Sequence, residues 1–284
     1  MQLCKIRTDG GVRIGMVRGG QLALLDLTQS AGVNGIADIL AAPDPARLVM
    51  QLVDMKLTTF PMDYKSLLPP VDRQEIWAAG VTYKRSKVAR EAESVGAATF
   101  YDKVYTAERP ELFMKATAER VVGPQQPVRI RKDSRWSVPE PELALFISPA
   151  MSIVGYTIGN DMSARDIEGE NPLYLPQAKI YNQSCALGPV ITLPAAMPQA
   201  DQVAIDLKIE RGGAVAFQGG TKLTAMARTL ESLVDWLGRE NSFPNGVVLL
   251  TGTGVVPPDE FTLQSGDRIT IEITGIGRLV NTVA

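Results

Sequence analysis

Two glutamates, Glu140 and Glu142, stand one residue apart at the start of the apolar run Leu143–Ile147. In an extended strand alternate side chains share a face, so we expect both carboxylates to point the same way, about 7 Å apart along the chain. The run that follows is apolar on both faces, which predicts a strand buried on both sides. Two carboxylates at the mouth of such a strand are costly unless a positive charge compensates them. A bound divalent cation would supply that charge.

A third carboxylate and a candidate substrate clamp follow in the segment 155–166, which reads GYTIGNDMSARD. The carboxylate is Asp161 and the clamp is Arg165. Three carboxylates without sulfur or imidazole are a donor set suited to a hard ion such as Mg²⁺, Mn²⁺ or Ca²⁺. Taken alone, a Glu-x-Glu pair more often marks a solvated strand end, so the metal interpretation depends on the groups that accompany it.

The chain contains no histidine. This excludes Ser-His-Asp and Cys-His catalytic units, a histidine-ligated zinc site and general-base catalysis by imidazole. Acid–base chemistry must therefore fall to Glu, Asp, Lys or Tyr side chains, or to metal-bound water.

The composition is that of an ordinary globular protein: 284 residues, 45% hydrophobic, 21% charged, with a net charge of −2. This balance gives no basic field for nucleic acid or an acidic membrane. We find no apolar run long enough to span a membrane and no signal-peptide core at the first residues. Cys4 and Cys185 are too few and too far apart for a disulfide framework, so we expect a cytoplasmic protein.

The chain is predicted to have a mixed α/β, β-rich fold with two parts, a small N-terminal α+β domain at 1–70 and a catalytic domain at 71–284. In the first part the strands are predicted at Leu3–Arg7, Val12–Val17 and Gln21–Leu27, the helices near Ile36–Leu40 and Ala46–Met55, and a linker at Asp63–Val71. No catalytic constellation occurs there, so this part is expected to serve packing or oligomer contacts.

The second part alternates strands with a few helices. Strands are predicted at Ile76–Gly80, Val247–Leu250, Arg268–Ile273 and Arg278–Val283, and helices at Lys84–Ser94, Phe100–Arg109 and Thr229–Arg239. Two prolines and Gly169 predict that 167–181 is an ordered loop. The turn at 251–254, Thr-Gly-Thr-Gly, lacks the lysine and helix of a phosphate loop.

Three ordered strings, PEPELA at 139–144, the segment 155–167 and QAK at 177–179, together resemble the fumarylacetoacetate hydrolase family over about residues 75 to 283. The resemblance implies the family's β-roll catalytic fold, assembled as a homodimer or homotetramer. It implies that Glu140, Glu142 and Asp161 bind the metal, with Mg²⁺ expected and Mn²⁺ or Ca²⁺ as alternatives. The substrate-binding groups that it implies are Arg165, Lys179 and Thr253.

Two further segments, GENPLYLPQAK at 169–179 and RPELF at 109–113, resemble the branch of this family that dehydrates 2-dehydro-3-deoxy sugar acids. Ser86 stands where the hydrolases have a histidine that activates water, which disfavours hydrolysis. The implied reaction is the Mg²⁺-dependent dehydration of 2-dehydro-3-deoxy-D-arabinonate to 2,5-dioxopentanoate through a metal-stabilised enolate, in pentose catabolism.

Dehydration needs a base at C3 and an acid at C4. Lys179 is our candidate base and Glu111 our candidate acid, and exchanging the two roles fits the sequence equally well. Lys115 follows Glu111 closely and is predicted to bind substrate. The remaining predicted contacts, for the distal hydroxyls, are Tyr83, Arg85 and Ser86.

Three other functions remain open. A metal-dependent hydrolase could cleave the C–C bond of an acylpyruvate or a 2,4-dioxo-3-deoxy sugar acid if Glu111 activated the water. A keto–enol isomerase or a decarboxylase would use the same ion. A binder without catalysis is disfavoured because the three carboxylates occur together with Arg165 and Lys179.

Overall fold

The fold is built around an antiparallel hairpin of strands β11 (Pro141–Ile147) and β12 (Ile153–Asp161). The computed structural model describes residues 1–53, 59–83 and 104–284. Within these residues the hairpin lies in the middle of a twelve-stranded sheet with the main order β4-β3-β2-β1-β14-β12-β11-β17-β6-β7. The helix predicted at Lys84–Ser94 and the start of the one at Phe100–Arg109 lie outside the described residues.

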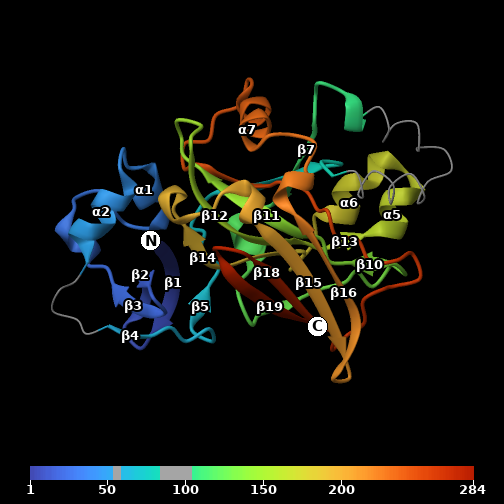
Figure 1. The fold of residues 1–284 in the computed structure, drawn as a ribbon, viewed down its shortest axis with the longest axis horizontal. Coiled ribbons are helices and arrows are strands. Elements are labelled where there is room, and N and C mark those ends of the chain that lie inside the picture. Colours follow the sequence, from blue (N-terminus) through green and yellow to red (C-terminus); the bar gives the residue numbers. More distant parts are fainter. Residues whose placement is uncertain (54–58, 84–103) are drawn as a thin grey trace.

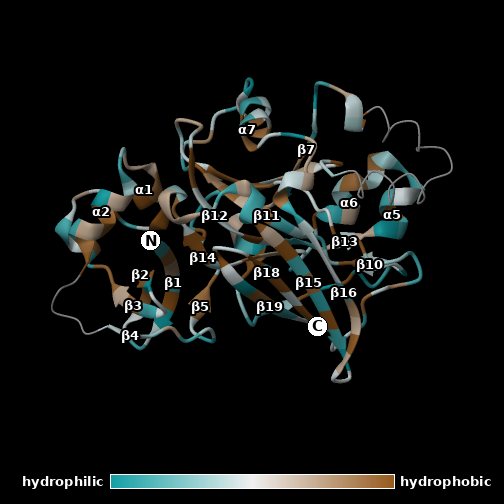
Figure 2. Cartoon of the chain, in the orientation of Figure 1, coloured by the Kyte–Doolittle hydropathy of each residue, from teal (hydrophilic) through white to brown (hydrophobic). Residues whose placement is uncertain are grey.

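Strand β11 is buried along its whole length, which confirms the prediction of a strand covered on both faces. Leu143, Leu145 and Ile147 belong to a core shared with a five-stranded sheet, β16-β15-β18-β19-β9. Ala144 and Phe146 belong to the core on the other face, which includes residues of the N-terminal helices. In Figure 2 the strands that enclose these cores carry the most hydrophobic stretches of the chain.

The other strands of the catalytic part lie around the hairpin (Figure 1). The strands of the large sheet here are β5 (Leu67–Leu68), β6 (Glu75–Gly80), β7 (Glu111–Ala116), β8 (Val121–Val122), β14 (Cys185–Thr192) and β17 (Val247–Leu250). The five-stranded sheet consists of β9 (Pro127–Val128), β15 (Ala204–Arg211), β16 (Ala214–Lys222), β18 (Arg268–Ile273) and β19 (Gly277–Val283). A two-stranded ribbon joins β10 (Ser137–Val138) to β13 (Ser163–Ala164). Short 3-10 helices are η2 (Ala118–Arg120), η4 (Pro194–Ala196), η5 (Ala200–Gln202) and η6 (Leu223–Ala225).

The N-terminal part contains the predicted strands and helices. They are β1 (Gln2–Thr8), β2 (Gly11–Arg18), β3 (Gln21–Leu24), η1 (Leu27–Gln29), α1 (Ile36–Ala41), α2 (Pro45–Leu52) and β4 (Phe60–Pro61). Strand β1 pairs with β14, so this part continues the large sheet. The domain boundary at residue 70 stays a prediction.

The segment 167–181 was predicted to be a loop, and this prediction is wrong. It forms α5 (Arg165–Glu170), η3 (Pro172–Tyr174) and α6 (Leu175–Lys179). Pro172 and Pro176 lie in the first turns of η3 and α6, where a helix does not need the missing N–H. The prolines therefore start short helices here.

Helix α7 (Leu230–Gly238) confirms the helix predicted from apolar periodicity. The Thr229 side chain accepts a hydrogen bond from the Ser232 N–H and so caps its first turn. Across the part of the chain that the structure describes, helices are too short or too polar to cross a lipid bilayer.

Candidate active site

The three predicted carboxylates meet at the open end of the β11–β12 hairpin. Glu140 and Glu142 flank the start of β11, and Asp161 ends β12, where its N–H donates to the Glu140 carbonyl at 3.0 Å. One oxygen from each carboxylate lies within 4.8 Å of the others. The three residues are at most 4% exposed. Such a buried set of hard oxygen donors fits a divalent cation.

Two of the predicted cations bind this cluster directly. The Lys179 ammonium at the end of α6 donates to Glu140 Oε2 at 2.7 Å, Asp161 Oδ2 at 3.1 Å and Ser163 Oγ at 2.7 Å. The Arg165 guanidinium at the start of α5 donates to Glu140 Oε1 at 2.7 Å. Helices α5 and α6, in the segment predicted to be a loop, thus position the side chains of Arg165 and Lys179. Ser163 is a site residue that the sequence did not single out.

Lys115, which was predicted to bind substrate, lies beside the cluster. Its ammonium is fully buried, forms an ion pair with Asp161 Oδ1 at 2.5 Å, and donates to the Met162 carbonyl at 2.9 Å and the Lys179 carbonyl at 2.6 Å. These three contacts surround the ammonium group. The arrangement favours a role in holding Asp161 and Lys179 in place over contact with a substrate.

We expect Lys115→Met to lower the free energy of unfolding by about 3 kcal/mol, because it removes one partner of a buried, hydrogen-bonded ion pair. Chemical denaturation measures this change. The exposed Lys132→Met is the matched control and should change stability by less than about 0.5 kcal/mol. Equal stability of the two variants would contradict this role.

Glu142 is held from the side of strand β17. Its Oε2 accepts the N–H of Gly252 at 2.5 Å. Gly252 has φ +92°, and a Cβ there would collide with the Thr82 hydroxyl and lie 2.9 Å from the Ala79 carbonyl. Only glycine therefore fits this approach of the backbone to the carboxylate.

The electrostatic environment of the cluster favours binding of an added cation. Burial raises the pKa of Glu142 well above its usual value, and the neighbouring Asp161 and Glu140 carboxylates raise it further. Burial also opposes ionisation of Asp161, but Lys115 and Lys179 lower the pKa of Asp161 below its usual value. The Lys179 charge only partly offsets these effects on Glu142, and a divalent ion bound to the cluster would provide further positive charge.

A small cavity opens beside the cluster. It is lined by Ala79, Gly80, Val81, Phe113, Glu140, Glu142, Asp161, Lys179, Gly252 and Thr253. Phe113 forms part of the cavity wall, and its ring centroid lies 5.7 Å from Lys179 Nζ. Its position two residues after Glu111 places it on the same face of a strand, but this spacing alone does not show that the strand borders the site.

The model of the fumarylacetoacetate (FAA) hydrolase C-terminal family matches residues 75–284. The chain belongs to this family. This confirms the predicted family, and the described fold agrees with the expected β-rich catalytic domain.

Several relatives in the family are similar over most of the chain. The probable 2-keto-3-deoxyxylonate dehydratase of Haloferax volcanii is 48% identical over 214 residues, which cover 75% of this chain and 73% of the relative. The 2-dehydro-3-deoxy-D-arabinonate dehydratase of Saccharolobus solfataricus is 42% identical over 236 residues, covering 78% and 79%. A solved structure of a 2-keto-3-deoxy-D-arabinonate dehydratase complexed with magnesium and 2,5-dioxopentanoate superposes with a TM-score of 0.84 at 34% identity, covering 100% of this chain and 98% of that one.

Of the other predicted site residues, the structure describes Glu111, Thr253 and Tyr83, and Glu111 pairs with the cavity residue Gly80 across β6 and β7. Thr253 lines the cavity, and its hydroxyl bonds the backbone of Val255. The Tyr83 ring packs against Gly254, where a Cβ would lie 2.6 Å from a ring carbon. Burial raises the pKa of the Tyr83 hydroxyl, and the Glu142 charge adds to this effect. Arg85 and Ser86 lie outside the described residues.

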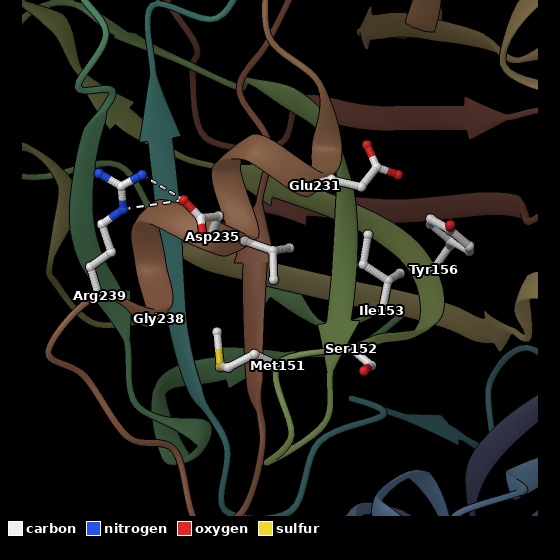
Figure 3. A pocket seen from close by; sticks show the side chains of 9 residues that line it. Met151, Ser152, Ile153, Tyr156, Glu231, Asp235, Gly238 and Arg239 are labelled. Carbon is white, nitrogen blue, oxygen red and sulfur yellow. Dashed lines mark hydrogen bonds and ion pairs between the residues drawn. The ribbon is translucent and has the colours of Figure 1, made fainter.

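A second cavity, of about 650 Å³, lies between the β11–β12 turn and α7. Figure 3 shows Glu231 and Tyr156 on one side of it and the Asp235–Arg239 ion pair on the other. None of the predicted site residues is among those that line it. The chemistry of the family member is therefore expected at the carboxylate cluster.

Proposed function

We propose that this protein is a metal-dependent lyase that dehydrates 2-dehydro-3-deoxy-D-arabinonate to 2,5-dioxopentanoate with Mg²⁺. The observation that carries the proposal is the buried cluster of Glu140, Glu142 and Asp161 in contact with Lys179. It is supported by the similarity to two relatives with dehydratase names and to a dehydratase structure with magnesium and this product.

Glu140, Glu142 and Asp161 would hold the ion, with Mn²⁺ or Ca²⁺ as possible replacements for Mg²⁺. A bound divalent ion supplies Lewis-acid stabilisation of the negative charge that develops on the ketone oxygen when C3 loses a proton. The proton transfers of the reaction are carried out by side chains of the protein.

Lys179 and Glu111 exchange the protons of the reaction in this proposal. One takes the proton from C3 and the other protonates the C4 hydroxyl, which leaves as water and creates a C3–C4 double bond. Proton shifts from C5 and its hydroxyl then saturate C3 and C4 and leave an aldehyde at C5. Lys179 is the preferred base because it lines the cavity, and a bound ion together with the Arg165 guanidinium on Glu140 would favour its neutral amine form.

Arg165 and Thr253 are proposed to bind the substrate carboxylate. Arg165 brings a charged donor to the cluster, and Thr253 places a hydroxyl in the cavity wall. We propose that Tyr83 contacts the distal hydroxyls together with Arg85 and Ser86.

We further propose that the protein acts in the cytoplasm as a homodimer or homotetramer. Both cysteines are free and buried, which suits a reducing compartment. Burial raises the pKa of each thiol to about 12, so neither is a ready thiolate. Light scattering coupled to size-exclusion chromatography tests the assembly, and a monomer would overturn it.

The function is tested by NMR of the purified protein with Mg²⁺ and 2-dehydro-3-deoxy-D-arabinonate. We expect 2,5-dioxopentanoate to form, to stop forming after chelation with EDTA, and to form again when Mg²⁺ is added in excess. Unchanged substrate, together with release of pyruvate from a 2,4-dioxo acid, would instead identify a hydrolase.

A further inference from the structure

Gly80 lies opposite the candidate proton-transfer residue Glu111 on the neighbouring strand. The two residues are direct partners in the antiparallel pairing of β6 and β7, and Ala78 and Phe113 are the next pair on the same face. Strand β6 thus presents its smallest residues opposite the bulky groups of β7. Gly80 and Phe113 both line the cavity beside the carboxylate cluster.

The Glu111 carboxylate occupies the space that a side chain at Gly80 would need. A Cβ built on Gly80 would collide with Glu111 Oε2, and it would lie 2.6 Å from Cδ and 3.3 Å from Cγ of the same side chain. Gly80 is not among the glycines with positive φ. Its backbone conformation therefore does not require glycine, and the requirement comes from the space that Glu111 fills.

We propose that Gly80, which lines the metal cavity, is a positioning residue that holds the Glu111 carboxylate next to this part of the cavity wall by leaving room for it. The inference rests on the proposed function, in which Glu111 exchanges a proton with the substrate. The three heavy atoms nearest to the added Cβ all belong to the flexible Glu111 side chain. An added methyl group therefore moves the carboxylate and leaves the strand in place.

Activity tests this inference through Gly80→Ala, Glu111→Gln and the double variant. We expect Gly80→Ala to lower kcat by about 10²-fold or more, the usual contribution of general acid–base catalysis. KM and the Mg²⁺ affinity measured by calorimetry should change little. In the Glu111→Gln background the same glycine substitution should have no further effect, because both changes act on one carboxylate. An unchanged kcat, additive losses or a loss of Mg²⁺ binding would overturn the inference.

The chain offers a matched control in Gly220 of β16. Gly220 pairs with Asp206 of β15, and a Cβ there would likewise collide with a carboxylate oxygen across an antiparallel pair. This pair belongs to the exposed edge of the five-stranded sheet. Gly220→Ala should therefore keep the full kcat.

A crystal structure of Gly80→Ala tests the placement without turnover, so it separates this inference from the proposed function. The Glu111 carboxylate should have left the face of residue 80 while the β6 and β7 backbones superpose on the parent structure. A carboxylate found in its original place would overturn the inference even if the protein were an active dehydratase. An inactive parent protein with a displaced carboxylate would overturn the proposed function alone.

Discussion

Lys179→Met is expected to lower kcat by about 10³-fold or more, within the range that a positioned acid or base contributes. The Lys179 ammonium contacts Glu140, Asp161 and Ser163, and it lines the cavity in which the substrate would bind. Among the described residues, the neighbouring Lys115 cannot easily replace it, because the Lys115 ammonium is already held by three contacts. The measurement is kcat at saturating Mg²⁺ and substrate.

Mg²⁺ affinity separates a catalytic role of Lys179 from a structural one. Lys179 and a bound ion would both interact with the carboxylates of Glu140 and Asp161, so Lys179→Met should bind Mg²⁺ at least as well as the parent protein. The exposed Lys222→Met is the control and should keep full activity. Full turnover by Lys179→Met would exclude this lysine as the base, and weakened Mg²⁺ binding would indicate that it shapes the site.

The metal cluster could be predicted because its signals are local or regular. The alternation of side chains in β11 sets Glu140 and Glu142 on one face, and the hairpin register returns Asp161 to the same end. The composition of the donor set then indicates the class of ion. These steps need no knowledge of distant contacts.

The roles of Phe113 and Lys115 could not be predicted in the same way. Strand β7 reaches the site because it pairs with β6, which in turn pairs in parallel with β17, about 170 residues further along the chain. Nothing in the local sequence of β7 specifies that neighbourhood. The same holds for Gly80, whose fit to Glu111 depends on strand register.

The prediction of a loop at 167–181 was wrong for a reason that lies in the local sequence. Prolines and a glycine are typical of loops, but proline is also favoured in the first turn of a helix. The sequence signal did not distinguish these two uses. The distinction has a functional consequence, because α5 and α6 are the elements that direct Arg165 and Lys179 at the carboxylates.

The charges of the described site explain why an ion and an anionic substrate would bind together. The three carboxylates of the cluster face three cationic side chains, those of Lys115, Arg165 and Lys179. A divalent ion added to this balanced set creates a net positive field in a buried cavity. Such a field favours a 2-oxo acid, whose carboxylate and ketone oxygen both carry negative charge or develop it.

Mg²⁺ is expected to stabilise the protein more strongly as the pH rises, and Glu142→Gln should abolish most of this effect. Without an ion, the raised pKa of Glu142 stabilises the folded protein at pH values below 4.5, the usual pKa of a glutamate. This stabilisation is lost as the pH rises through the raised pKa of Glu142 in the folded protein. An ion that binds the charged carboxylate reverses this loss. Asp161 has a lowered pKa, so its contribution to stability changes only below pH 3.8 and does not affect this pH range.

Thermal unfolding with and without saturating Mg²⁺, at about pH 5 and about pH 8, measures the effect. A free Mg²⁺ concentration of about 100 times the Kd at the higher pH stabilises the folded protein by about 2.7 kcal/mol. Each kcal/mol raises Tm by roughly 2 to 4 °C. The shift should be larger at the higher pH in the parent protein and in the exposed control Glu260→Gln. It should be small at both pH values in Glu142→Gln, which should also lose turnover. A full Mg²⁺ shift in Glu142→Gln would show that the ion binds elsewhere, because the amide keeps the shape of the side chain and removes only the charge that the ion would compensate.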